Sequence, residues 1–164
     1  MSKENIILTG FMGSGKSAVG KILAERLGYR FVDTDLLIEV RAGRTVAEIV
    51  EREGEDSFRA WEANVARALA DERATVIATG GRLLLNSKNA QMLGSNGQVF
   101  CLTANPDEII IRMQKEDAKR PLLAVPNPDA RIMELLAERA EGYARFPQIS
   151  TDNKSIEQVA TEIQ

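Results

Sequence analysis

The segment Gly10-Phe11-Met12-Gly13-Ser14-Gly15-Lys16-Ser17 matches the pattern G-x-x-x-x-G-K-[ST] and decides how this chain is expected to fold. The apolar run at residues 5–9 before it is typical of a strand, and residues 17–27 after it are typical of a helix. A glycine-rich loop in this setting directs backbone N–H groups at a phosphate, and the helix N-terminus adds partial positive charge. The segment predicts a nucleotide-binding loop in which Lys16 faces the β- and γ-phosphates and Ser17 offers its hydroxyl to Mg²⁺.

The alternation of strand-like and helix-like runs continues along the whole chain, which is the pattern of βαβ units. Helix starts are marked by capping boxes at Thr45 and Ser155 and by proline at the first helical position at Pro106 and Pro128. We therefore expect a single α/β domain over residues 1–164, built on a five-stranded parallel sheet. The expected strands are residues 5–9, 30–33, 75–78, 98–102 and 148–150.

Two stretches are longer or more charged than a minimal crossover needs. Residues 36–70 predict three charged helices, which we interpret as an inserted flap. Residues 114–126 carry many charges and two prolines, and they predict a surface loop of the kind that acts as a lid. Arg120 in this loop would reach a transferring phosphoryl group when the loop closes.

Composition excludes several classes of function. The 164 residues carry 21 Lys and Arg against 24 Asp and Glu, and a net charge of -3 argues against nucleic-acid or anionic-membrane binding. Histidine is absent, which excludes Ser-His-Asp triads and His-ligated zinc. The single cysteine, Cys101, makes no internal disulfide and favours a reducing compartment, with the cytoplasm as the expected location. Acid–base chemistry must therefore use carboxylates, Lys or Arg.

Two carboxylates, Asp33 and Asp35, stand at the end of the second expected strand, where ligands gather in open α/β sheets. In a strand both would point to the same side. One could then hold Mg²⁺ through water while the other reaches an acceptor hydroxyl, as phosphoryl transfer to an alcohol requires. The alternative is that the pair only ends the strand and caps the following helix.

Two further features suit the binding of a ligand. Arg59 and Glu62 are three residues apart on a helix, so that Glu62 can hold Arg59 ready for a substrate carboxylate; an ordinary surface pair is the alternative. Gly80 and Gly81 follow the third strand, and their bare backbone allows a ligand to approach closely.

The chain resembles the shikimate kinases over almost its full length. The resemblance is carried by GFMGSGKSAVG at 10–20, DTD at 33–35, FRAWE at 58–62, TGG at 79–81 and RPLL at 120–123. It implies a three-layer P-loop fold like that of the nucleoside-monophosphate kinases, with a five-stranded parallel sheet, a helical substrate flap and a lid. It also implies an enzyme that transfers the γ-phosphoryl group of ATP to the 3-hydroxyl of shikimate, acting as a monomer with ATP and Mg²⁺.

The resemblance assigns a role to each matching residue. Catalysis would involve Lys16, Asp35 and Arg120, with Asp35 also holding the shikimate hydroxyls. Mg²⁺ would be held by Ser17 and, in its outer shell, by Asp33. The shikimate carboxylate would be bound by Arg59 and Arg139, beside the substrate-facing turn at Gly80 and Gly81. ATP would contact Gly13, Ser14, Gly15, Lys16, Ser17, Ala18, Arg120, Asn153 and Lys154.

Two positions depart from the family pattern. Arg82 stands where the family usually has a third glycine. If this position requires a positive φ, a side chain would strain the chain there and its bulk would narrow the acceptor pocket; the favoured alternative is that Arg82 points outward. Arg112 lies about one residue out of register with the arginine that stacks on adenine, and that contact is left unassigned. Two alternative functions stay open: a related small-molecule kinase, such as a gluconate kinase, and a nucleotide-binding regulatory protein that has lost catalysis.

Overall fold

The computed structural model describes residues 4–115 and 125–164. Five parallel strands form one sheet in the order β2-β3-β1-β4-β5. The strands are β1 (Asn5–Gly10), β2 (Arg30–Asp33), β3 (Thr75–Ala78), β4 (Gly97–Thr103) and β5 (Gln148–Ser150). The helices are α1 (Lys16–Leu27), α2 (Thr34–Ala42), α3 (Val46–Glu53), α4 (Glu55–Leu69), α5 (Ser87–Gly94), α6 (Pro106–Gln114), α7 (Pro128–Tyr143) and α8 (Ile156–Ile163), with a 3-10 turn, η1, at Leu83–Leu85. The five-stranded parallel α/β fold expected from the sequence is confirmed.

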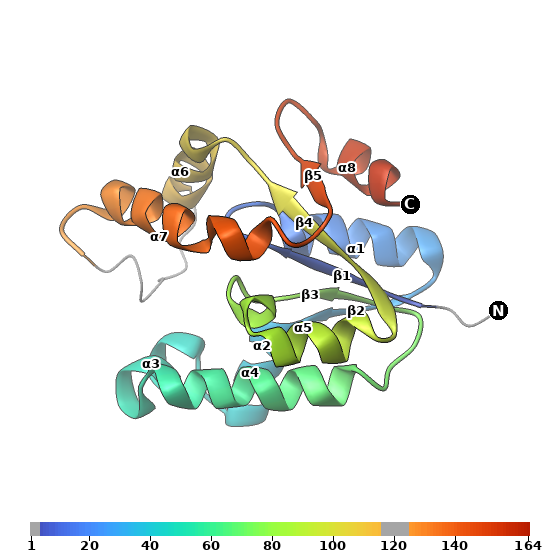
Figure 1. Cartoon of the computed structure of the whole chain (residues 1–164), viewed down its shortest axis with the longest axis horizontal. Coiled ribbons are helices and arrows are strands. Elements are labelled where there is room, and N and C mark those ends of the chain that lie inside the picture. The colour runs from blue at the N-terminus through green and yellow to red at the C-terminus, as the bar shows by residue number, and fades with distance from the viewer. Residues whose placement is uncertain (1–3, 116–124) are drawn as a thin grey trace.

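The sheet lies between two layers of helices because its central strands are apolar on both faces. Leu8, Val76 and Leu102 pack against α1 and α8 on one face. Ile7 and Ile77 point to the other face, where they pack against α4 and α5. In Figure 1, α1 and α8 lie together on one side of the strands, while α3 and α4 lie on the opposite side.

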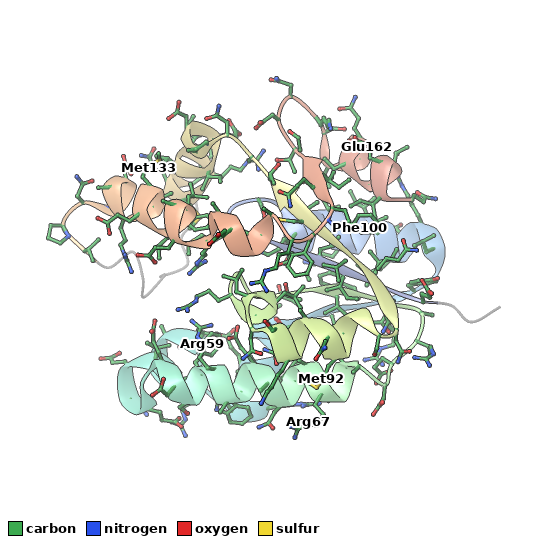
Figure 2. The ribbon with its side chains drawn as sticks, viewed as in Figure 1. Arg59, Arg67, Met92, Phe100, Met133 and Glu162 are labelled. Atoms are coloured by element: carbon green, nitrogen blue, oxygen red, sulfur yellow. The ribbon has the colours of Figure 1, made fainter. Side chains whose placement is uncertain are left out.

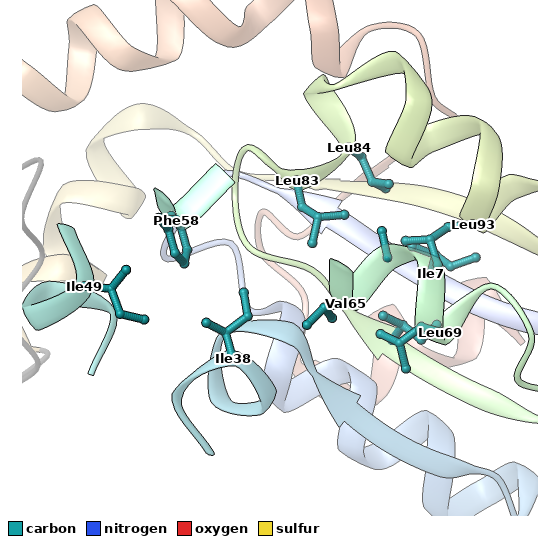
Figure 3. Close-up of a cluster of buried hydrophobic side chains, with 11 residues drawn as sticks. Ile7, Ile38, Ile49, Phe58, Val65, Leu69, Leu83, Leu84 and Leu93 are labelled. Carbon is teal, nitrogen blue, oxygen red and sulfur yellow. The ribbon is translucent and has the colours of Figure 1, made fainter. Parts of the chain in front are cut away.

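The largest buried cluster joins the sheet to the helices that follow β2. Figure 3 shows Ile38 of α2, Ile49 of α3 and Phe58 of α4 converging with Leu83 of the 3-10 turn. These four side chains are nearly or fully inaccessible to solvent. The helices of residues 36–70 therefore share one core with the turn that follows β3, and this core fixes where the polar faces of α2 and α4 lie.

Helix boundaries follow from local chemistry. The capping boxes at Thr45 and Ser155 are both present, with each hydroxyl accepting from the backbone N–H three residues on. Pro106 and Pro128 occupy the first turns of α6 and α7 behind asparagine caps. Helix α5 was not expected from the sequence. Half of its eight residues are polar, and the side chain of Asn86 caps it.

Gly10 ends β1 at a point where no side chain fits. Its φ is +137°, and a Cβ atom there would collide with the backbone carbonyl oxygen of Leu102 in β4. The chain can leave β1 and enter the glycine-rich loop only because this position has no side chain.

Gly10→Ala should therefore lower the free energy of unfolding by at least about 2 kcal/mol, because it combines a strained φ with a backbone collision. Urea unfolding followed by circular dichroism measures this change. Gly94→Ala is the matched control, since Gly94 lies in a helix with open space around it, and its effect should stay within about 1 kcal/mol. Equal midpoints for Gly10→Ala and the parent would contradict the steric argument.

Candidate active site

The carboxyl ends of β1, β2 and β3 meet at one edge of the sheet because the three strands are parallel and in register. Leu8 in β1 and Asp33 in β2 both pair with Ala78 in β3. The loop after β1, the start of α2 and the turn after β3 therefore lie next to one another. This is the edge at which open α/β sheets bind ligands.

The loop from Gly10 to Lys16 is built to receive an anion. Gly15 is the N-cap of α1, and no side chain caps this helix, so its first N–H groups are available to a ligand. Lys16 Nζ donates to the carbonyl oxygens of Gly10 (2.6 Å) and Phe11 (3.2 Å), which ties its charge to the loop. Ser14 Oγ is buried, and none of the described residues provides it with a hydrogen-bond partner. A phosphate oxygen in the loop would provide one.

Asp33 links this loop to the next helix. Its Oδ2 accepts a hydrogen bond from Ser17 Oγ at 2.7 Å, and its Oδ1 accepts from the backbone N–H groups of Asp35 (3.0 Å) and Leu36 (3.2 Å). The hydroxyl and the carboxylate fit Mg²⁺, which usually takes one or two protein oxygens together with phosphate oxygens and water. No group of three potential metal ligands occurs in residues 4–115 and 125–164.

The arrangement of the two aspartates differs from the one expected. The strand ends at Asp33, and Asp35 lies in the first turn of α2. The expectation that both carboxylates point to the same side of a strand is therefore wrong. The helix begins two residues earlier than that expectation required because the Asp33 side chain caps it.

Asp35 and Glu62 crowd against the turn that follows β3. A Cβ atom on Gly80 would lie 2.6 Å from Asp35 Oδ1 and 3.3 Å from Glu62 Oε2. The backbone N–H of Gly80 also donates to Thr34 Oγ1 at 2.9 Å. Glycine is therefore required at position 80 for close approach, and its φ is not in the left-handed region.

Glu62 is a buried carboxylate held by an arginine. Its side chain is 2% exposed and accepts from Arg59 Nη1 at 2.5 Å, while the Arg59 side chain is 30% exposed. Burial raises the pKa of Glu62, the charge and hydrogen bond of Arg59 oppose this, and the neighbouring charge of Asp35 raises the pKa further. Figure 2 shows Arg59 on the side of α4 that faces the turn after β3 and Arg67 on the opposite side. The pair is thus no ordinary surface ion pair.

Arg139 reaches the same turn from α7. It is only 5% exposed, and a Cβ atom on Gly81 would lie 2.9 Å from its Nη1. Its Cζ stands 5.3 Å from the centre of the Phe11 ring. Burial lowers the pKa of Arg139, and the described part of the chain offers this guanidinium no carboxylate partner. A carboxylate from a ligand would supply the missing negative charge.

Tyr143 is a residue whose part in the site the sequence did not reveal. Its hydroxyl donates to the carbonyl oxygen of Gly81 at 2.5 Å, and burial raises its pKa. The only signal in the sequence was its position four residues after Arg139, which places both on one face of α7.

A pocket of about 550 Å³ lies next to the glycine-rich loop. Asn153 and Lys154 line it, as does Arg112, which the sequence left unassigned. Arg112 Nη1 donates to the carbonyl oxygen of Gly13 (3.0 Å) and to Thr151 Oγ1 (3.3 Å), so it connects the pocket to the loop.

The remaining site predictions are placed as follows. Gly13 and Ala18 border the start of α1, with Ala18 exposed in its first turn. Arg120 and most of the loop at 114–126 lie outside the described residues. Burial raises the pKa of the Cys101 thiol to about 11, which keeps it protonated. Of the helices in the described ranges, none combines the length and apolar character needed to span a bilayer.

The chain is similar to known proteins over almost its full length. The family model described as shikimate kinase matches residues 12–164. A shikimate kinase from Caldanaerobacter subterraneus is 46% identical over 98% of this chain and 94% of its own length. A shikimate kinase from Acinetobacter baumannii, solved in complex with shikimate, superposes with a TM-score of 0.92 at 37% identity and covers 98% of this chain and 90% of that chain.

More distant structures share the fold alone. A gluconokinase from Sinorhizobium meliloti superposes with a TM-score of 0.63 at 20% identity, over 97% of this chain and 88% of that chain. The much higher identity and TM-score of the first group favour it over the gluconate-kinase alternative. The chain belongs to the shikimate kinase family.

Proposed function

We propose that this protein transfers the γ-phosphoryl group of ATP to the 3-hydroxyl of shikimate, giving ADP and shikimate 3-phosphate. One observation carries the proposal. The phosphate loop and a cluster of acidic and cationic side chains meet at the turn of Gly80 and Gly81. A Cβ atom on Gly81 would lie 2.9 Å from Arg139 Nη1 and 3.7 Å from the carbonyl oxygen of Gly10, which accepts from Lys16, and a Cβ atom on Gly80 would lie 2.6 Å from Asp35 Oδ1.

The nucleotide would lie between the pocket and the loop. Gly13, Ser14, Gly15, Lys16, Ser17 and Ala18 would hold the phosphates, as the uncapped start of α1 allows. Asn153 and Lys154 would border the adenosine part in the pocket that Arg112 joins to the loop.

Ser17 and Asp33 would hold the metal ion. Bound Mg²⁺ supplies charge neutralisation for the β- and γ-phosphate oxygens. The Ser17 hydroxyl is placed for direct contact with the ion, and Asp33 for contact through water, because one Asp33 oxygen already caps α2. The helix cap therefore also orients the metal site.

Asp35, Arg59 and Arg139 would hold the acceptor. Arg139 and Arg59 would bind its carboxylate, and Asp35 would orient the hydroxyl beside the bare backbone of Gly80 and Gly81. The hydroxyl oxygen forms the new bond to the γ-phosphorus as the bond to the ADP oxygen breaks, and the hydroxyl proton passes to Asp35. The phosphoryl transition state is loose, so positioning and charge count for more than base strength. Arg120 stays predicted from the sequence as the lid arginine.

The proposal also covers location and assembly. We propose a monomer that works in the cytoplasm and has neither membrane nor nucleic acid as a partner. Its support is the net charge of -3, which provides no general attraction for polyanions, and the single cysteine, which suits a reducing compartment.

Shikimate-dependent ADP release in the presence of ATP and Mg²⁺ tests the proposal directly. The parent protein should show it. Asp35→Asn should lose about 100-fold or more of the rate, because the acceptor hydroxyl loses the carboxylate that orients it and takes its proton, while ATP affinity stays near that of the parent. Asp71→Asn, an exposed change at the end of α4, is the matched control. A parent with no shikimate-dependent activity would favour the nucleotide-binding regulatory alternative, and equal loss of ATP affinity in Asp35→Asn would move Asp35 to the metal.

Lys16→Met should lower kcat by about 100- to 1,000-fold, because it removes a preformed charge that faces the transferring group. Steady-state kinetics measure the loss, and circular dichroism checks that the fold survives. Lys21→Met, on the exposed side of the same helix, should retain parental turnover. Parental turnover in Lys16→Met would overturn the assignment of the loop.

Arg59→Ala should destabilise the ligand-free protein by about 1–3 kcal/mol at pH 7, because it leaves the buried Glu62 carboxylate without its cation. The folded pKa of Glu62 already lies above the ordinary 4.5 through burial, and loss of Arg59 raises it further. Below pH 4.5 Glu62 is mostly protonated in both the folded and unfolded states, so the loss should be small there. It should grow as the pH rises through the folded pKa of Glu62, which burial raises above 4.5.

Urea unfolding at pH 4 and pH 7 measures this dependence. The double variant Arg59→Ala/Glu62→Gln has no carboxylate at position 62. The difference in the free energy of unfolding between this double variant and Glu62→Gln should therefore hardly change with pH. A loss in Arg59→Ala that is equal at both pH values would show that the ion pair contributes little to stability.

A further inference from the structure

Arg82 occupies a fixed place beside the acceptor site. It follows Gly80 and Gly81, and the turn is held by hydrogen bonds from Leu83 N–H to the Gly80 carbonyl oxygen and from Leu85 N–H to the Arg82 carbonyl oxygen, both 3.1 Å. Leu83 and Leu84 are fully buried, whereas Arg82 is exposed. The backbone of Arg82 is therefore anchored while its side chain meets solvent.

The backbone at this position does not require glycine. The φ of Arg82 is -107°, which any residue adopts, so the strain considered for a side chain in place of the family's third glycine does not arise. Arg82 in place of the family's third glycine therefore introduces no backbone strain at this position. What Arg82 contributes must come from its side chain.

The side chain begins close to the guanidinium of Arg139. A Cβ atom on Gly81 would stand 2.9 Å from Arg139 Nη1, and the Cα of Arg82 lies about 3.8 Å from the Cα of Gly81. The 3-10 turn that Arg82 precedes contacts both α4 and α7, the two helices that carry Arg59 and Arg139. Arg82 thus precedes a turn that contacts both helices carrying the arginines that would bind the acceptor carboxylate.

The charge of Arg82 acts on the groups around this point. Burial raises the pKa of Glu62, and the charges of Arg59 and Arg82 oppose that rise. Burial lowers the pKa of Arg139, and Arg82 and Arg59 lower it further. Groups on α4 and on α7 therefore both lie within electrostatic range of Arg82.

The cluster of charged side chains around Arg82 contains more positive than negative groups. Glu62 pairs with Arg59, and Asp35, which lies against Gly80, is the second carboxylate at this turn. Neither Arg82 nor Arg139 has a carboxylate partner within residues 4–115 and 125–164. Two like charges near one another without an anion repel, and an anion placed between them removes the repulsion and gains attraction from both. A ligand carboxylate is the group that completes this arrangement.

We propose that Arg82 is a specificity-determining residue of the acceptor site, whose guanidinium supplies a third positive charge to the subsite that Arg59 and Arg139 form for the acceptor carboxylate. The inference rests on the proposed function and names a residue that this function does not need. Because the Arg82 side chain is exposed and long, its contribution falls on binding of the acceptor and leaves the chemical step unchanged.

The test compares Arg82→Gln, Arg82→Lys and the matched control Arg67→Gln, whose arginine is exposed on the far side of α4 (Figure 2). Isothermal titration calorimetry measures acceptor binding directly. Titrations use shikimate and its uncharged carboxamide at low and high salt. Steady-state kinetics give KM for shikimate, KM for ATP and kcat.

We expect Arg82→Gln to weaken shikimate binding by about tenfold or more, with kcat and KM for ATP close to parental values. Arg82→Lys should recover most of the affinity because it keeps the charge, and Arg67→Gln should match the parent. The carboxamide should bind the parent and Arg82→Gln equally. The affinity of the parent for shikimate should also fall more steeply with salt than that of Arg82→Gln.

An active parent whose Arg82→Gln variant binds shikimate within about threefold of the parent overturns the role of Arg82 and leaves the proposed function standing. Equal weakening of shikimate and carboxamide binding overturns it as well, because the effect would not depend on the carboxylate. A parent with no shikimate-dependent ADP release and no shikimate binding overturns the proposed function and the inference together.

Discussion

The carboxylate of Asp33 connects the parts of this site that would otherwise be independent. One oxygen accepts the hydroxyl of Ser17 at the start of α1, and the other caps α2. A single side chain therefore fixes the phosphate loop relative to the helix that carries Asp35. Because both oxygens are used within the protein, the metal ion is expected to meet Asp33 through water, and the distance between nucleotide and acceptor is set by the backbone of β2 and α2.

Most of the fold could be predicted from the sequence because the signals are local. The strands β2, β3 and β5 have the expected bounds, and the capping boxes at Thr45 and Ser155 form as expected. These features depend on residues within a few positions of one another. Helix α5 was missed because its short, half-polar sequence has no apolar period, and its place depends on Leu93 packing into the core.

The site was less predictable because its contacts are made between residues that are far apart in the sequence. The burial of Glu62, the hydrogen bond of Tyr143 to Gly81 and the bridge made by Arg112 between Gly13 and Thr151 all depend on how α4, α6 and α7 pack. The position of Asp35 was mistaken for a different reason. The pattern of alternate residues in a strand was extended two positions too far, past the point where Asp33 begins a helix.

The burial of Arg139 lowers the stability of the folded protein but favours binding of the acceptor. The guanidinium of Arg139 is already removed from water when the protein folds. A carboxylate that binds to it is therefore attracted without a further cost of desolvating the arginine. An apolar side chain of similar volume would relieve the folded protein of this cost. Selection for thermal stability alone would therefore be expected to replace Arg139 and to produce more stable proteins that no longer bind their acceptor.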